Sequence, residues 1–125
     1  MAKQKPAAEP KLRIRVVFGD SGMLGPGKAD LLELIGETGS IAAAGRRMKM
    51  SYKRAWTLVE TMNALFTEPV VISSRGGEQG GGARLTETGQ TVLETYRRLE
   101  TETRMAGAKE IATLLALTRD ISDGK

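Results

Sequence analysis

The sequence of 125 residues contains no cysteine and no histidine. Without cysteine, disulfide bonds and thiolate metal sites are excluded, and the composition fits a reducing compartment. Without histidine, zinc hydrolase sites, Ser-His-Asp triads and imidazole-based acid–base chemistry are excluded as well. These absences remove major catalytic classes, so we expect a protein that is not an enzyme and holds no metal.

Aromatic residues make up only 4% of the sequence, so the core must rest on Leu, Ile, Val, Met and Ala. No apolar run approaches the roughly 20 residues that a membrane-spanning helix needs. The opening residues, MAKQKPAAEPK, lack the apolar core of a signal peptide. We therefore expect one compact domain in the cytoplasm, without membrane contact.

Positive charge is concentrated in one part of the chain. Residues 39–86 carry seven basic and three acidic side chains, whereas the two signs nearly balance before and after them. The densest stretch, AAAGRRMKMSYKRAW at residues 42–56, has five basic and no acidic side chains. Such a patch on a near-neutral scaffold indicates a polyanionic partner, although a run of charge can also be a solvated helix face.

The spacing of apolar residues, glycine and proline predicts a mainly α-helical protein with a small β component. Gly39 is suited to end one helix, and Ser40, Ser51 and Thr86 are suited to begin others, because their hydroxyls can accept from unpaired helix N–H groups. The predicted elements are a disordered tail at 1–10, a strand at 11–18, a loop at 19–27, helices at 28–39, 41–48 and 52–66, a strand at 70–73, a glycine-rich tip at 74–83, a return strand at 83–85, a long helix at 87–118 and a flexible tail at 119–125.

Two short helices joined at Lys49 and Met50 form a helix-turn-helix pattern. Residues 43–45 are small, which lets two steeply crossing helices approach closely. The hairpin that follows would be a wing, so residues 11–86 are expected to form a winged helix-turn-helix domain. In such a domain the first turn of the helix at 52–66 would enter a DNA major groove.

Side chains on and around these helices are candidates for DNA contact. Basic residues would neutralise phosphates, the first turn would face base edges, and the glycines of the wing would bring N–H groups close to the DNA backbone. Two positions are compatible with the spacing of Trp56, one packed under the wing and one facing DNA. The capping serines and the glycine tip can also have a purely structural role. The candidate DNA-binding residues are Ser40, Arg46, Arg47, Lys49, Ser51, Tyr52, Lys53, Arg54, Trp56, Thr57, Arg75, Gly80, Gly81 and Arg84.

Three segments resemble the N-terminal DNA-binding domain of the ModE family of molybdate-responsive bacterial regulators. They are GSIAAAGRRMKMSYKRAWTLVETMN at 39–63, GGEQGGGARLT at 76–86 and TGQTVLETY at 88–96. The LysR-type regulators share a looser version of the same domain. The resemblance extends over roughly residues 11–118 and implies a winged helix-turn-helix that binds double-stranded DNA.

The resemblance also implies a homodimer, formed through the long C-terminal helix and the N-terminal strand. The apolar residues of the predicted helix at 87–118 agree, because they exceed what a small domain can cover. ModE proteins carry molybdate in separate C-terminal Mop domains, and a chain ending at Lys125 has none, so we expect no cofactor in this chain and an unknown effector. The expected dimer-interface residues are Leu12, Ile14, Val16, Val92, Tyr96, Leu99, Ile111, Leu114 and Leu115.

The sequence therefore predicts a transcriptional regulator that binds specific DNA sequences as a homodimer, with a link to molybdate or metal homeostasis. The alternative is a dimeric protein-interaction module that uses the winged-helix fold without DNA, and a direct oxyanion sensor is a third candidate that no residue cluster supports. Residues 22–28 match the G-x-x-x-x-G-K pattern of nucleotide-binding loops. Ala29 stands where Ser or Thr would hold magnesium, so nucleotide hydrolysis is not expected.

Overall fold

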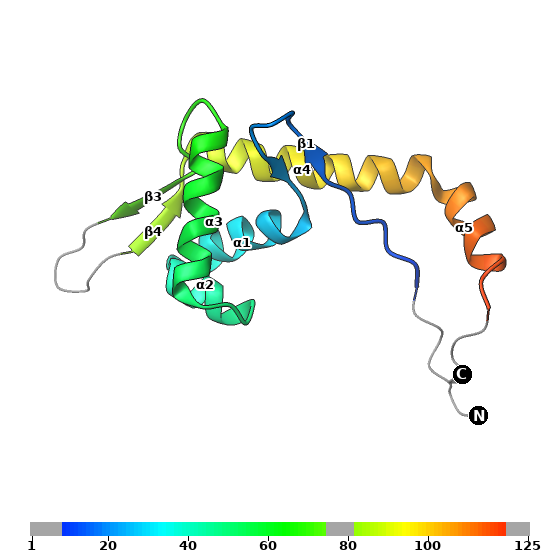
Figure 1. The fold of residues 1–125 in the computed structure, drawn as a ribbon, viewed down its shortest axis with the longest axis horizontal. Coiled ribbons are helices and arrows are strands. Elements are labelled where there is room, and N and C mark those ends of the chain that lie inside the picture. Colours follow the sequence, from blue (N-terminus) through cyan, green and yellow to red (C-terminus); the bar gives the residue numbers. More distant parts are fainter. Residues whose placement is uncertain (1–8, 75–81, 120–125) are drawn as a thin grey trace.

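The computed structural model describes residues 9–74 and 82–119, so most of both predicted tails and of the predicted tip lie outside the described residues. Figure 1 shows a small helical domain from which one long helix extends as an arm that ends in a shorter helix. Helices dominate and the strands form two short antiparallel hairpins, which confirms the predicted fold class. In chain order the elements are β1 (Val16–Val17), β2 (Met23–Leu24), α1 (Pro26–Thr38), α2 (Ile41–Arg47), α3 (Tyr52–Leu65), β3 (Val71–Ser74), β4 (Gly82–Leu85), α4 (Glu87–Ala106) and α5 (Ala108–Ala116).

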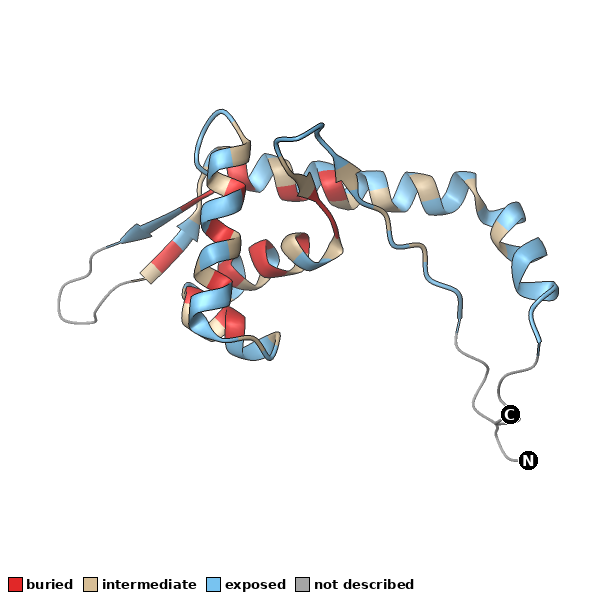
Figure 2. Cartoon of the chain, viewed as in Figure 1, coloured by how far each residue is buried: buried red, intermediate tan, exposed pale blue. Residues whose placement is uncertain are grey.

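The core lies where α1, α2, α3 and the first half of α4 meet (Figure 2). Each helix turns an apolar face inward, and burying one large apolar side chain contributes about 1.5–3 kcal/mol. This burial fixes α2 and α3 on α1 and so determines which of their side chains reach solvent. The buried residues include Leu31, Leu32 and Ile35 of α1, Ala44 of α2, Val59 and Met62 of α3, and Leu93 and Tyr96 of α4.

The predicted helix boundaries around the helix-turn-helix are confirmed. Gly39 has a φ of 72° and ends α1, where its N–H donates to the carbonyl of Ile35. The Ser40 hydroxyl accepts from the N–H of Ala43 at 3.0 Å, and the Ser51 hydroxyl accepts from the N–H of Arg54 at 3.0 Å. These caps satisfy N–H groups at the start of α2 and α3.

The wing is the antiparallel hairpin of β3 and β4, in register from Val71 opposite Leu85. Asn63 on α3 anchors its first strand. The carboxamide oxygen of Asn63 accepts from the N–H groups of Val70 (2.7 Å) and Val71 (3.2 Å), and its amide donates to the carbonyl of Val71 (3.1 Å). The base of the wing is therefore tied to the same helix that would enter DNA.

The N-terminal strand is shorter than the predicted 11–18. Only the two residues of β1 pair, with β2, which lies inside the predicted loop at 19–27. Residues 12–15 alternate between half-buried and exposed, as predicted, but no described strand pairs with them. A hydrogen bond from the Tyr96 hydroxyl to the carbonyl of Ile14 (2.6 Å) holds them instead. An alternating pattern fixes which side chains face inward, whereas a strand also needs a partner backbone.

The predicted helix at 87–118 is divided in two. α4 ends at Ala106, Gly107 follows, and α5 begins at Ala108. Glycine is a weak helix former because it loses the most backbone entropy on ordering. In Figure 1, α5 bends away from the axis of α4. None of the helices within the described ranges has the length and apolar character that crossing a membrane requires.

The lysine of the segment that matches a nucleotide-binding loop is hydrogen-bonded within the protein. α1 begins at Pro26, a residue favoured in the first helical turn. The Lys28 ammonium donates to the carbonyl of Met23 at 2.9 Å, and burial lowers the pKa of Lys28. The lysine thus ties β2 to α1, which is a structural role.

Candidate nucleic-acid interface

The turn between α2 and α3 has the hydrogen bonds of a Schellman motif. The N–H of Lys49 donates to the carbonyl of Arg46 (3.0 Å), and the N–H of Met50 donates to the carbonyl of Gly45 (2.9 Å). Lys49 has a φ of 61°, and no other non-glycine residue in the described ranges has a positive φ. A positive φ at this position favours glycine. Placing a lysine there costs about 1 kcal/mol or more in backbone strain.

The two helices of the motif cross at close range, as the small residues predicted. A Cβ atom on Gly45 would lie 3.1 Å from the Cβ of Ala55 and 3.5 Å from the carbonyl oxygen of Met50. Ala44 and Ala55 are fully buried at the crossing. This packing turns the first turn of α3 away from the core and toward solvent.

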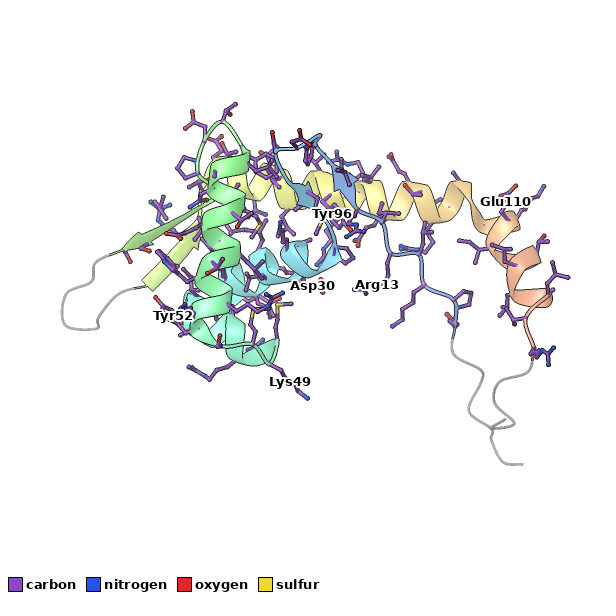
Figure 3. All side chains as sticks on the ribbon, viewed as in Figure 1. Arg13, Asp30, Lys49, Tyr52, Tyr96 and Glu110 are labelled. Carbon is purple, nitrogen blue, oxygen red and sulfur yellow. The ribbon has the colours of Figure 1, made fainter. Side chains whose placement is uncertain are left out.

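The basic side chains of this region are all exposed, namely those of Arg46, Arg47, Lys49, Lys53 and Arg54. Figure 3 places Lys49 and Tyr52 at the same end of the domain, where α2 and α3 meet. Arg47 forms an ion pair with Glu37 at 3.5 Å, and both side chains are more than half exposed. An exposed pair of this kind contributes at most about 1 kcal/mol, so Arg47 remains able to exchange Glu37 for a phosphate.

Trp56 forms an aromatic pair with Tyr52. Tyr52 is 57% exposed, and Trp56 is half-buried against the core. Their ring centroids are 6.5 Å apart and the ring planes differ by 14°, so the rings are stacked. Trp56 therefore supports an aromatic side chain that faces solvent.

A hollow of about 280 Å³ lies beside this pair. It joins three parts of the motif that are separate in the sequence: the start of α2, the start of α3 and the two strands of the wing. Of the predicted site residues, the hollow brings Ser40 and Tyr52 together. Its lining residues are Ser40, Ile41, Ala42, Tyr52, Ser73, Gly82 and Ala83.

The other predicted DNA-binding residues do not line this hollow. Lys53, Thr57 and Arg84 are exposed, and Ser51 is exposed with its hydroxyl engaged as a cap. The predicted contacts of the wing tip, Arg75, Gly80 and Gly81, lie outside the described residues. Sequence reasoning missed Ala42 and Ser73 in the hollow and the anchoring role of Asn63, because no local pattern marks contacts between distant segments.

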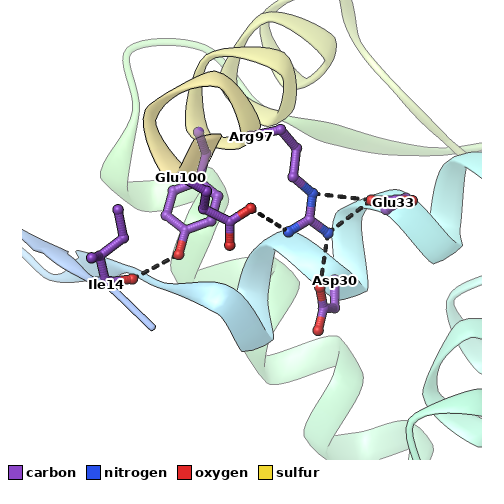
Figure 4. A network of polar contacts seen from close by, with 6 residues as sticks. Ile14, Asp30, Glu33, Arg97 and Glu100 are labelled. Carbon is purple, nitrogen blue, oxygen red and sulfur yellow. Dashed lines mark hydrogen bonds and ion pairs between the residues drawn. The ribbon is translucent and has the colours of Figure 1, made fainter. Parts of the chain in front are cut away.

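The arm is tied to the domain by a cluster of charges centred on Arg97 of α4 (Figure 4). Its guanidinium bonds to Asp30 (2.8 Å) and Glu33 (2.7 Å) on α1 and to Glu100 (3.1 Å) on its own helix. Burial disfavours the charge of Arg97, but these hydrogen bonds outweigh burial and raise its pKa. The cluster joins α4 to α1, and a hollow lined by Asp30, Glu33 and Arg97 also reaches Arg47 of the basic face.

The residues predicted to form the dimer interface differ in how far the single chain buries them. Tyr96 is only 2% exposed within the single chain, which leaves little of its side chain for a second copy to contact. Burial raises the pKa of Tyr96, whose hydroxyl donates to Ile14. Ile14 and Val92 are half-buried and also pack on the core of their own chain, as their apolar character favours. Leu99, Leu114 and Leu115 are exposed, whereas Leu12, Val16 and Ile111 are half-buried.

No metal site accompanies this face within the part of the chain that the structure describes. Histidine and cysteine are absent from the sequence, and the described acidic residues form no group of three or more that could hold a metal ion. This face offers exposed cationic side chains, which donate hydrogen bonds, together with an exposed aromatic ring. Such a surface suits binding to a polyanion.

Comparison with known proteins connects this geometry to bacterial regulators. No protein-family model matches the chain. The molybdenum transport protein ModE of Azotobacter vinelandii is 46% identical over 76 residues, which are 61% of this chain and 28% of that protein. The DNA-binding transcriptional dual regulator ModE of Escherichia coli strain K12 is 38% identical over 71 residues, which are 57% of this chain and 27% of that protein. Over this stretch the chain is homologous to the ModE proteins.

The chain also matches the molybdenum-pterin-binding protein MopB of Rhodobacter capsulatus, with 46% identity over 77 residues, 62% of this chain and 28% of MopB. The chain spans less than a third of the length of these relatives. The solved structure of full-length CbnR, a LysR-type regulator complexed with its target DNA, matches with a TM-score of 0.54 and 21% identity, over 69% of this chain and 28% of CbnR. This structural likeness supports the winged helix-turn-helix fold.

Proposed function

We propose that this chain is a transcriptional regulator of the ModE type that binds specific sequences of double-stranded DNA as a homodimer. The observation that carries this proposal is the exposed basic face at the start of α3, where Lys49, Lys53 and Arg54 surround Tyr52 on a winged fold. The names of the relatives, which include a transcriptional regulator ModE and a molybdenum-pterin-binding protein, support a role in molybdenum-linked regulation. We further propose that the chain is not an enzyme and acts in the cytoplasm.

The residues of the basic face would have two roles. Arg46, Arg47, Lys49 and Arg54 would contact phosphates, which supplies affinity without sequence information. Tyr52, Lys53 and Thr57, on the exposed side of α3, would face base edges in the major groove. In a dimer the two copies of α3 would enter successive major grooves about 34 Å apart.

The homodimer would form through the arm. α5 and the end of α4 expose Leu99, Met105, Leu114, Leu115 and Leu117, which a single chain leaves uncovered. The same apolar surface supports the alternative function, a protein-interaction module without DNA. The basic face favours the DNA-binding regulator, because a module that binds only through its arm has no need of it.

A salt titration tests the function. We expect the affinity of the full chain for duplex DNA to fall steeply with salt, with Arg47→Ala weakening all duplexes alike and reducing the log–log slope by about two, one for each subunit of the dimer. Lys53→Ala should instead weaken the preferred sequence more than others, by about 1–3 kcal/mol. Fluorescence anisotropy with labelled duplexes measures both.

Lys109→Ala, which removes an exposed charge from α5, is the matched control and should leave binding unchanged. Sedimentation separates the two functions: a dimer that binds no duplex at low salt would favour the interaction module. If Arg47→Ala and Lys53→Ala both bind like the original chain, the basic face is not the DNA-binding surface.

A further inference from the structure

The aromatic pair on α3 points to a specific feature of the DNA. The whole chain has only five aromatic residues, and two of them, Tyr52 and Trp56, lie on the basic face. The other three are engaged within the protein, because Tyr96 is buried and the rings of Phe18 and Phe66 contact each other at 6.1 Å. Tyr52 is thus the most exposed aromatic side chain of the described residues, at 57%. Its ring has no apolar cover on its outer side.

The ring is also held in place. The stacking partner Trp56 packs against the core and supports Tyr52 from one turn further along α3. Tyrosine has only two side-chain torsions, so a ring fixed in this way loses little entropy on binding. Tyr52 also lines the hollow shared with α2 and the wing, which leaves open space beside the ring. The Tyr52 hydroxyl has no hydrogen-bond partner in the described ranges, so the ring, not its polar atom, is what the structure holds fixed.

Next to the pair, α3 presents a second and different row of side chains. Lys53 and Thr57 are exposed and are one helical turn apart, as Tyr52 and Trp56 are. One row is therefore cationic and polar, and the other is aromatic. In the major groove, guanine offers acceptors to a lysine, whereas thymine alone offers an apolar group, its C5-methyl.

We propose that Tyr52, supported by Trp56, recognises the C5-methyl group of a thymine in each half-site of the DNA. The methyl group would pack against the exposed ring and leave water, while Lys53 contacts a neighbouring base pair. This inference rests on the proposed function, since it requires α3 to enter the major groove. It goes further by assigning the chemical group that one residue reads.

The first experiment removes only the methyl group. Duplexes preferred by the full chain are enriched from a random-sequence library, and each thymine of an enriched duplex is replaced in turn by deoxyuridine. We expect affinity to fall about fourfold at one thymine per half-site, the effect of losing one buried methyl group. Enriched sites without a T·A pair in the half-site, or equal affinity for every deoxyuridine duplex, would overturn the proposal.

The second experiment assigns the methyl contact to a residue. Tyr52→Ala should bind the thymine and deoxyuridine duplexes equally, whereas Tyr52→Phe, which keeps the ring, should retain the fourfold preference. Thr61→Ser is the matched control, because it removes a methyl group from an exposed position further along α3 and should also retain the preference. Loss of the preference in Thr61→Ser or in Tyr52→Phe would overturn the role of the Tyr52 ring.

The outcomes also separate this inference from the proposed function. Tyr52 is exposed, so its variants should keep the circular dichroism spectrum of the original chain. Salt-dependent DNA binding that is indifferent to the thymine methyl would overturn only the role of Tyr52. A chain that binds no enriched or random duplex would overturn the DNA-binding function itself, and the methyl contact with it.

Discussion

At the scale of single residues, Lys49 shows a conflict between stability and the proposed function. It occupies the position after α2 where the Schellman motif favours glycine, with a φ of 61°. A lysine in this conformation loses backbone energy, yet its side chain extends from the tip of the basic face (Figure 3). Strain held at such a position indicates that the charge is needed there.

We therefore expect Lys49→Gly to stabilise the fold by about 1 kcal/mol and to weaken DNA binding. The loss of one phosphate contact from each subunit of the dimer should reduce the log–log salt slope by about two. Urea denaturation measures the first effect and anisotropy the second. Lys49→Asn is the control, because asparagine tolerates this backbone conformation and carries no charge; it too should weaken binding. A glycine variant that is less stable, or that binds DNA as before, would contradict this account of the turn.

The sequence predicted the roles of single residues where those roles depend on neighbours close in the chain. The roles of Ser40, Ser51 and Gly39 were predictable because a cap depends on neighbours a few residues away. The position of Trp56 was not, because helical spacing places it between the exposed and buried faces of α3. Its stacking on Tyr52 is a contact that only the structure shows.

At the scale of elements, the wing depends on one side chain of α3. Asn63 makes all its hydrogen bonds to Val70 and Val71, the residues that lead into β3. We expect Asn63→Ala to lower the free energy of unfolding by about 2–3 kcal/mol, since it leaves buried backbone groups unpaired. Amide hydrogen exchange should become faster at Val71, and DNA affinity should fall as the wing loses its position.

The variant Asn63→Asp distinguishes the hydrogen bonds that Asn63 accepts from the one that it donates. A carboxylate still accepts from the N–H groups of Val70 and Val71 but cannot donate to the carbonyl of Val71. Its unfolding free energy should lie between those of the original chain and Asn63→Ala. If all three proteins unfold at the same urea concentration, Asn63 does not hold the wing.

Elements were predictable where their signals are local and not where they depend on distant partners. The helices at α2 and α3 follow from caps and spacing, and their bounds differ little from the prediction. The strand at 11–18 was overestimated, because its alternation reflects packing near Tyr96 and not pairing. The break at Gly107 was missed because one glycine can be tolerated inside a helix, and only the completed structure shows where the helix bends.

At the scale of the whole molecule, the arm and the basic face are mechanically connected. The Arg97 cluster joins α4 to α1, and α1 carries α2 and α3 through the shared core. The orientation of α3 is therefore fixed relative to the arm. In the proposed dimer, the contact between two arms would set the distance between two basic faces and so the spacing of the half-sites.

The proposed dimer can be tested on α5, where Leu114 is 64% exposed. We expect Leu114→Glu to dissociate the dimer, because each copy would place a carboxylate in an apolar contact. Burying an unpaired charge there costs on the order of several kcal/mol. The variant should sediment as a monomer and lose at least about tenfold in affinity for a duplex with two half-sites, but not for a single half-site. Ala116→Glu adds the same charge to another exposed position on α5, about 200° around the helix from Leu114, and should remain dimeric. If Leu114→Glu sediments with the original chain while binding both duplexes equally well, the arm does not form the dimer and the half-site spacing must be set elsewhere.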